Sequence, residues 1–340
     1  MRIFLTGGTG FIGSAVLNEL VRSGHDVAAL VRSDAAAGKV ETAGARAVRG
    51  ELTDGELLAR EAASADGVIH AASPGDATNA AVDTAVLDAV LSALSGSGKP
   101  YVHTGGTWIH GSGDDITEET PPDPPPIVAW RPAINDRVRV AAADGVRSVI
   151  VAPGNVYGYS KGIPALLLNS PKTGGDEPAL LYPDRGQHFS NVYIEDIAAL
   201  YALALSEAPP GSYYLGTNDE SPSIGDLAVA ASRARGLDGR TEPEAPDATR
   251  ERLGPMTDAL LLDQRVTSRH ARSLGWTPAG PSLVEEMSTG SYSRVRPTNN
   301  RGVLMTGSVM LAPSRWSPDR RRGRGRDPEG GRPGQKIPGV

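Results

Sequence analysis

The first thirteen residues constrain the fold more than any other stretch of the chain. Arg2 to Leu5 form a short, mostly apolar run that predicts a buried strand, and an amphipathic helix is predicted from Ala15 onward. Glycines lie between them at positions 7, 10 and 13. Gly7 allows a sharp turn, Gly10 lets a pyrophosphate approach the backbone, and Gly13 lets the helix pack close to the strand. This order predicts a dinucleotide site in which the helix N-terminus faces phosphate.

The end of the second predicted strand, Asp26 to Val31, indicates which dinucleotide is bound. NAD enzymes place an acid there to hold the ribose 2′-hydroxyl, whereas NADP enzymes place a cation. In this chain Arg32 can pair with a 2′-phosphate and Ser33 can hydrogen-bond it. We therefore predict NADP(H) as the cofactor, while the nearby Asp34 keeps NAD as the alternative.

The rest of the chain alternates strands and helices before it becomes less regular. Further strands are predicted at 46–48, 67–70, 100–104 and 147–152. One predicted helix ends at residue 63, and two more are predicted over 77–94 and 130–143. This alternation predicts an α/β fold, a Rossmann-type doubly wound parallel sheet with a smaller, interleaved C-terminal substrate cap. We predict a cofactor domain at 1–155 and a cap at 156–292. A basic tail at 293–340 is predicted to be disordered, either as a solvated end without a selected role or as a tether for nucleic acid or an acidic surface.

Composition excludes several classes of protein. The 340 residues carry a net charge of −6, and the tail from Ser293 holds 11 Lys and Arg against 3 Asp and Glu, so the body is acidic. An acidic body argues against nucleic-acid binding. The chain has no cysteine, no signal peptide before the first strand and no apolar run of about 18 residues. We expect a cytoplasmic protein that needs no metal and no membrane, with a small-molecule substrate and, as a partner, a second copy in a homodimer.

Several segments resemble one known family when they are taken together. They are Thr6 to Gly13, Asp66 to Ala72, Thr104 to Gly111, Pro153 to Gly158 and Asn191 to Asp196. The chain resembles the extended short-chain dehydrogenase/reductases, the NAD-dependent epimerase/dehydratase family. The glycine motif, the strand ends and this resemblance imply the following cofactor residues: Gly7, Gly10, Phe11, Ile12, Gly13, Arg32, Ser33, Glu51, Leu52, Ala71, Ala72, Ser73, Thr104, Pro153, Asn155 and Val156.

The catalytic residues implied by the resemblance are replaced. Redox members of the family use a Tyr-x-x-x-Lys pair and a Ser or Thr, and the Tyr exchanges a proton with the substrate oxygen. Here the Tyr position falls on Ile127, the Lys position on Arg131 and the Ser position on Gly106. No tyrosine lies between Tyr101 and Tyr157, so the chain resembles an atypical member of the family.

Other side chains near these positions are candidate substitutes. Thr107, or Thr104, can hold a carbonyl oxygen, and Tyr157 or His110 can donate a proton. Arg131 stays protonated, so it can orient a carboxylate or pair with Asp136, but it cannot act as a base.

Two other features are interpreted as having no catalytic role. The Tyr157-x-x-x-Lys161 spacing follows a strand and is interpreted as a chance match, and His70 as a core or pocket-wall residue.

Three functions remain open at this point. The first is an NAD(P)-dependent oxidoreductase or epimerase that acts on a carbonyl or hydroxyl group. The composition is rich in Gly, Ala, Arg and Pro and poor in Lys, which indicates a GC-rich genome, and many such enzymes act in secondary metabolism. The second is a non-redox cyclase, dehydratase or isomerase, and the third is a nucleotide-sensing regulator without catalysis. Ile163 to Leu168, with Trp108 and Trp130, favour an apolar or aromatic ligand or form an ordinary core.

Overall fold

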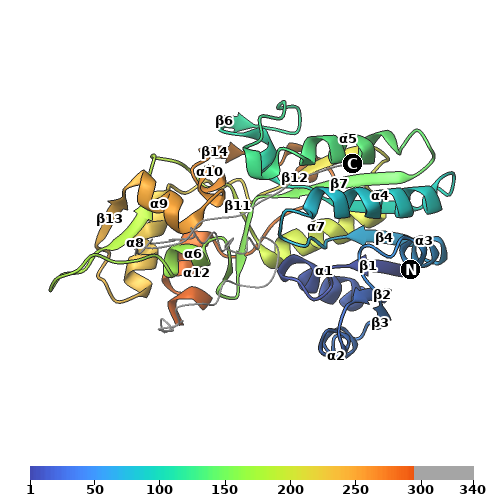
Figure 1. The fold of residues 1–340 in the computed structure, drawn as a ribbon, viewed down its shortest axis with the longest axis horizontal. Helices are drawn as coiled ribbons and strands as arrows, with labels where there is room; N and C mark the ends of the chain where they lie inside the picture. Colours follow the sequence, from blue (N-terminus) through green and yellow to red (C-terminus); the bar gives the residue numbers. More distant parts are fainter. Residues whose placement is uncertain (295–340) are drawn as a thin grey trace, which may run out of the picture.

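A seven-stranded parallel sheet forms the centre of the larger part of the computed structural model, which describes residues 1–294 (Figure 1). Its strand order is β12-β7-β5-β4-β1-β2-β3. The strands are β1 (Arg2–Thr6), β2 (Asp26–Val31), β3 (Arg46–Arg49), β4 (Gly67–His70), β5 (Pro100–Thr104), β7 (Arg147–Pro153) and β12 (Ser212–Gly216). The order runs outward in both directions from β1 and β4, so a crevice opens beyond their carboxyl ends. The predicted doubly wound α/β fold is confirmed.

Helices cover both faces of this sheet and thereby bury its strands on both sides. On one face lie α1 (Phe11–Arg22), α2 (Asp34–Thr42) and α7 (Ile194–Glu207), and on the other α3 (Gly55–Ser64), α4 (Asn79–Leu94) and α5 (Arg131–Val140). Alternate residues of a strand enter different cores. In β1, Ile3 and Leu5 pack with α1 and α7, whereas Phe4 packs with α3 and α4.

The remaining elements form a smaller cap with its own apolar core (Figure 1). Its strands are β8 (Asn155–Gly158), β9 (Lys161–Gly162), β10 (Leu180–Pro183), β11 (Asn191–Tyr193) and β13 (Thr241–Glu244). Its helices are α6 (Ala165–Leu168), α8 (Ile224–Ala234), α9 (Pro246–Leu253), α10 (Met256–Leu260) and α12 (Leu283–Ser288). Between cap segments, α7 and β12 return to the sheet, as an interleaved cap requires. The division of the chain at residue 155 remains our interpretation.

Short elements connect the two parts. These are the 3₁₀ turns η1 (Thr107–His110), η2 (Pro126–Val128) and η3 (Ser291–Arg294), the strands β6 (Gly113–Ile116) and β14 (Gln264–Val266), and α11 (Arg269–Ser273). The sequence predicts an irregular loop at 113–126, but β6 forms there. Its partner β14 lies about 150 residues further along the chain, so no local pattern reveals it.

Some boundaries differ from those the sequence predicts. The helix predicted at 130–143 extends only from Arg131 to Val140. Ser223, rather than the predicted Ser221, caps α8, because its Oγ accepts a hydrogen bond from the Asp226 N–H. The tail predicted to be disordered falls, from residue 295 on, outside the described residues. No helix within 1–294 has the length and apolar character that crossing a membrane requires.

Candidate cofactor and active site

The glycine turn between β1 and α1 has the geometry of a phosphate cradle. Gly7 has a φ of +81°, and a Cβ there would lie 2.5 Å from the Ala71 carbonyl oxygen. A Cβ on Gly13 would lie 2.1 Å from the Gly7 carbonyl oxygen, so the helix and the strand approach as closely as the sequence predicts. Gly10 precedes α1 and offers no side-chain cap, which leaves the first N–H groups of the helix for a ligand. These residues fit a bound pyrophosphate.

At the end of β2 one cation is free and the nearby acid is engaged. Arg32 is exposed and makes no side-chain hydrogen bond or ion pair within residues 1–294. Ser33 caps α2, since its Oγ accepts from the Ala36 N–H at 3.2 Å. The Asp34 carboxylate forms an ion pair with Arg49, at the end of β3. The group that would hold a ribose 2′-hydroxyl is thus paired, whereas the group that would hold a 2′-phosphate is not.

The other predicted cofactor residues follow the carboxyl ends of their strands. Phe11 and Ile12 begin α1, Glu51 and Leu52 follow β3, Ala71, Ala72 and Ser73 follow β4, Thr104 ends β5, and Pro153 ends β7. Asn155 and Val156 open β8 and are buried. The Asn155 side-chain amide donates to the Ser190 carbonyl at 2.9 Å, so it fixes the neighbouring cap strand.

Thr107 faces the cap. It begins η1 and is 1% exposed, and its Oγ1 lies 3.4 Å from Oε1 of Gln264. The same amide donates through Nε2 to the carbonyls of Thr107 and Gly111. Gln264 on β14 therefore holds η1 in place, which is a role that sequence spacing does not reveal.

Arg131 is a partly buried cation at the start of α5. Its Nη1 donates to the Thr104 carbonyl at 3.1 Å, and its guanidinium lies 4.6 Å from the centre of the Trp130 ring. Burial lowers the pKa of Arg131, and the negative charge of Asp83 opposes this shift. The alternative in which Arg131 pairs with Asp136 is not seen in residues 1–294: Asp136 is exposed, and the negative charge that acts on Arg131 is that of Asp83.

Tyr157 does not present a free hydroxyl. Its side chain is fully buried in the cap core, and its hydroxyl donates to the Pro281 carbonyl at 2.5 Å. Burial raises its pKa. Tyr157 also pairs with Gly162 in the β8–β9 hairpin, so the Tyr157–Lys161 spacing is not on a helix, and a Tyr-Lys pair of the helical kind does not form. This placement argues against the predicted role of Tyr157 as proton donor.

His110 uses both ring nitrogens in structural hydrogen bonds. Nδ1 lies 2.8 Å from the Thr120 carbonyl and Nε2 lies 3.0 Å from the Tyr213 hydroxyl. Burial lowers the pKa of His110, so the ring is neutral, with Nδ1 donating and Nε2 accepting. This arrangement holds the loop after η1 and leaves neither ring nitrogen free to contact a substrate.

A buried polar cluster lies under the ends of β1, β4 and β5, and sequence reasoning did not assemble it. His70 Nδ1 is 2.7 Å from the Thr6 hydroxyl, and His70 Nε2 is 3.3 Å from Asp83 on α4. The His103 ring stacks at 5.5 Å on His70, and its Nδ1 is 3.0 Å from the Tyr101 hydroxyl. The sequence does contain a signal for this cluster, since a histidine lies near the end of each of two predicted strands. In the structure these strands are neighbours, and His70 and His103 are paired in register.

Burial and neighbouring charges together shift the pKa values in this cluster. Burial lowers the pKa of His103 to about 3, and the charge of His70 adds to this effect. Burial raises the pKa of Asp83, but its hydrogen bond with His70 and the charges of the neighbouring cations outweigh burial and leave the pKa below its usual value. In the described part of the chain, His103 Nε2 and both amide atoms of Asn135 are buried and have no hydrogen-bond partner. The cluster thus holds an ionised Asp83 close to the Arg131 cation.

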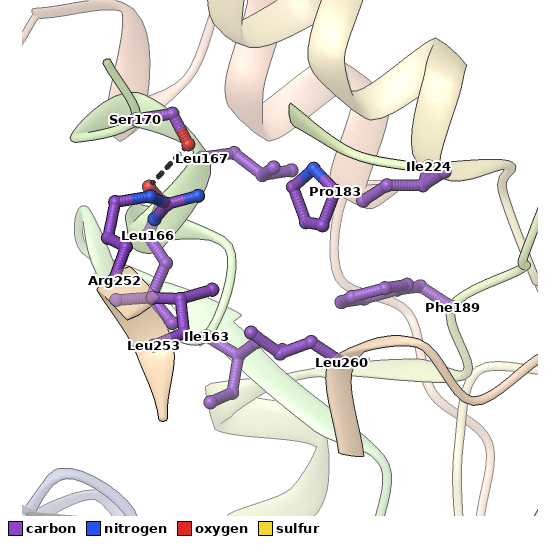
Figure 2. A pocket seen from close by; sticks show the side chains of 10 residues that line it. All are labelled: Ile163, Leu166, Leu167, Ser170, Pro183, Phe189, Ile224, Arg252, Leu253 and Leu260. Carbon is purple, nitrogen blue, oxygen red and sulfur yellow. Dashed lines mark hydrogen bonds between the residues drawn. The ribbon is translucent and has the colours of Figure 1, made fainter. Parts of the chain in front are cut away.

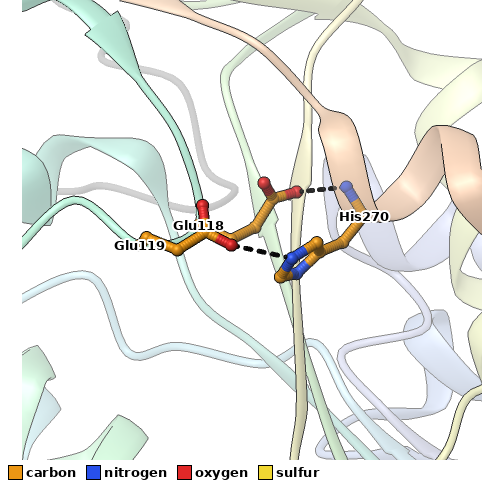
Figure 3. Close-up of side chains that lie close together, drawn as sticks. All are labelled: Glu118, Glu119 and His270. Carbon is orange, nitrogen blue, oxygen red and sulfur yellow. Dashed lines mark hydrogen bonds and ion pairs between the residues drawn. The ribbon is translucent and has the colours of Figure 1, made fainter.

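One group of side chains in the described part of the chain has the spacing of metal ligands (Figure 3). It consists of Glu118, Glu119 and His270. One Glu118 oxygen accepts from the His270 backbone N–H, and the Glu119 carboxylate lies 2.9 Å from His270 Nε2. Glu119 and His270 are exposed, and these contacts account for the cluster as a surface ion pair. The expectation that the chain needs no metal remains a prediction.

The fold and the glycine turn define a dinucleotide-binding α/β protein of the short-chain dehydrogenase/reductase type. The profile of the NAD dependent epimerase/dehydratase family matches residues 3–216, and the chain belongs to this family.

Three relatives illustrate its range. An uncharacterised protein of Saccharomyces cerevisiae is 32% identical over 84% of this chain and 98% of its own length. A 4-hydroxy-2-methyl-3-oxo-4-farnesyl-3,4-dihydroquinoline-1-oxide ketoreductase of Stigmatella aurantiaca is 29% identical over 70% of this chain and 74% of its own. The crystal structure of Thermus thermophilus UDP-glucose 4-epimerase with NAD has a TM-score of 0.66 and 22% identity, and covers 86% of this chain and 98% of that one.

Proposed function

We propose that this protein is an NADP(H)-preferring oxidoreductase that acts on a carbonyl or hydroxyl group of a small molecule. Membership of the family supports an NAD(P)-dependent enzyme in general. The preference for NADP(H) rests on one observation: Arg32 has no side-chain partner within residues 1–294 at the end of β2, while Arg49 pairs with Asp34. A guanidinium binds a 2′-phosphate by charge-assisted hydrogen bonds that a 2′-hydroxyl cannot make.

Two side chains near the end of β5, Arg131 and Thr107, are proposed to bind the reacting oxygen. The nicotinamide cofactor supplies hydride transfer when it is bound. Arg131 places a fixed positive charge beside the Thr104 carbonyl, where it stabilises negative charge that develops on a substrate oxygen. The Thr107 hydroxyl would have to turn from its contact with Oε1 of Gln264 to hold the same oxygen. Tyr157 and His110 are engaged elsewhere, so neither is proposed as the proton donor.

A non-redox cyclase, dehydratase or isomerase on the same scaffold is the second candidate. It is favoured by the absence of a free tyrosine or histidine proton donor beside Thr107 and Arg131 in the described part of the chain. Such an enzyme uses the Arg131 charge to stabilise an anion and needs no hydride. A regulator that only senses the nucleotide is the third candidate, and its further support lay in the basic tail, which is beyond the described residues.

Titration of the purified protein with NADPH and with NADH, followed by nicotinamide fluorescence, tests the proposal. We expect NADPH to bind at least about tenfold more tightly than NADH, since one charged hydrogen-bonded contact contributes roughly 1.5–3 kcal/mol. Arg32→Ala should remove this preference. Arg139→Ala is the matched control, because Arg139 is exposed on α5 without a side-chain partner in residues 1–294. Binding of neither nucleotide would overturn the oxidoreductase proposal in favour of the non-redox one.

A further inference from the structure

The interior of the cap leaves almost no space for a substrate. Ile163, Leu166 and Leu167, from the segment that the sequence offers either as a ligand site or as core, line a cavity together with Phe189 (Figure 2). The volume of this cavity is about 10 Å³, which is room for about one water molecule. These side chains therefore act as core, and recognition of a substrate is left to the crevice beyond the strand ends.

Arg131 lies at the edge of the sheet where that crevice opens. It is the first residue of α5, and α5 leads into β7, so the helix begins at the edge where the parallel strands end. Its Nη1 donates to the carbonyl of Thr104, the last residue of β5, at 3.1 Å. The loop that follows is open on one side, because a Cβ on Gly106 would have no heavy atom beyond its chain neighbours within 4 Å. The guanidinium is thus fixed to a strand end beside open space.

This guanidinium has unused donors and no anion in contact with it. Of its three nitrogens only Nη1 donates to an acceptor within residues 1–294. One of its faces is covered by the Trp130 ring, whose centre lies 4.6 Å away. The Asp83 carboxylate contacts His70 instead, and it forms no ion pair with Arg131 in the described part of the chain. A partly buried cation without an anion in contact is costly, because burial removes water from the charge.

We infer that the substrate supplies the missing anion: it carries a carboxylate next to its reacting carbonyl or hydroxyl group, and Arg131 binds that carboxylate. A guanidinium presents a planar fork of N–H donors that matches both oxygens of a carboxylate. Because the charge of Asp83 is close, this single cation compensates one further negative charge better than the two of a phosphate monoester. The inference rests on the proposed function and narrows its substrates to 2-oxo or 2-hydroxy acids, in which the carboxylate adjoins the reacting carbon.

The first experiment measures binding by ligand-observed NMR, with and without NADP⁺. The probes are benzoate, benzamide, which has the same shape without the charge, and phenyl phosphate. Benzoate should bind at least about tenfold more tightly than benzamide, because benzamide cannot form the charged hydrogen-bonded pair. Arg131→Lys keeps the charge but loses the fork, so it should weaken benzoate binding at least about tenfold. Arg139→Lys, at an exposed position of the same helix, is the matched control and should leave benzoate binding unchanged.

The second experiment measures NADPH oxidation with benzoylformate and with its methyl ester. The kcat/KM for the acid should exceed that for the ester at least about tenfold, and Arg131→Lys should bring this ratio close to one. The ester keeps the reacting carbonyl and lacks only the charge. Its carbonyl is also the more electrophilic of the two, so a preference for the acid cannot come from intrinsic reactivity.

The outcomes separate this inference from the proposed function. Benzoate binding that Arg131→Lys weakens, without NADPH oxidation, supports the carboxylate site and refutes the oxidoreductase. Faster reduction of the ester than of the acid supports the oxidoreductase and overturns the inference. Equal binding of benzoate and benzamide, tighter binding of phenyl phosphate, or no binding of benzoate also overturns it. These comparisons use the wild-type protein, so the inference stays falsifiable if Arg131→Lys does not fold.

Discussion

The edge of the sheet and the cap differ in the charge that they bury. Under the ends of β4 and β5, the buried Asp83 lies close to the partly buried Arg131, and His70 and His103 lie between the strands and α4. In the cap, Arg252 lies beside the apolar side chains of Leu253 and Leu260 and forms an ion pair with Glu244. The edge of the sheet therefore holds charged groups beneath the strand ends, whereas the interior of the cap is apolar.

The largest effect in this comparison should come from the close approach at the glycine turn. Gly13→Ala places a Cβ about 2 Å from the Gly7 carbonyl oxygen, so helix and strand must separate. We expect a loss of about 3 kcal/mol in the free energy of unfolding and about a hundredfold weaker NADPH binding. Urea unfolding and fluorescence titration measure both.

Gly38→Ala provides the control for this change. Gly38 lies within α2 with nothing within 4 Å of a new Cβ, so alanine should stabilise the protein by about 0.5–1 kcal/mol. Unchanged NADPH binding in Gly13→Ala would contradict the cradle.

The second prediction tests whether Asp83 and Arg131 act as a pair. Arg131→Met leaves the buried Asp83 charge without its cation, and we expect a loss of about 3 kcal/mol in stability together with a large fall in kcat. Asp83→Asn added to Arg131→Met should recover at least about 1 kcal/mol of stability but none of the activity. Denaturant midpoints and steady-state kinetics of the single and double variants complete the cycle. Strictly additive stability losses would show that the two charges do not interact.

The third prediction concerns pH and the same buried cluster. The pKa of His103 is about 3 in the folded protein and about 6.5 in an unfolded chain, so between these values the unfolded state binds the extra proton. Stability should therefore fall as the pH drops below about 6.5, by up to 1.4 kcal/mol per pH unit from this residue alone. Thermal unfolding from pH 7 to 5 should show a smaller decline for His103→Gln than for the wild type. Parallel declines would assign the acid sensitivity to other groups.

The smallest predicted effects come from two N-cap substitutions, and they separate helix capping from cofactor binding. Ser223→Ala in the cap and Ser33→Ala beside the sheet each remove a side-chain N-cap, and each should cost about 1 kcal/mol in stability. Only Ser33→Ala should also weaken NADPH binding, by roughly threefold to tenfold, because only Ser33 adjoins Arg32. Equal NADPH affinities of the two variants would remove Ser33 from the cofactor site.

Local sequence patterns determined the sheet side of this protein. The turn at Gly7 to Gly13, the strands of the Rossmann part and the position of Arg32 after β2 could all be predicted, because each depends on residues that are near one another in the chain. Strand burial repeats every second residue and helix burial every three to four, so these elements leave a periodic signal. The same reasoning identified Tyr157-x-x-x-Lys161 as a pattern that lies outside any helix, and the β8–β9 hairpin agrees with this interpretation.

Only the tertiary structure decided which side chains meet. Asp83 rather than Asp136 compensates Arg131, Gln264 holds Thr107 across 157 positions, and Pro281 accepts the Tyr157 hydroxyl. These contacts join residues whose spacing in the chain has no period. They form because folding buries polar groups that must then find partners wherever the chain brings them, and a sequence states which groups exist but not which of them become neighbours.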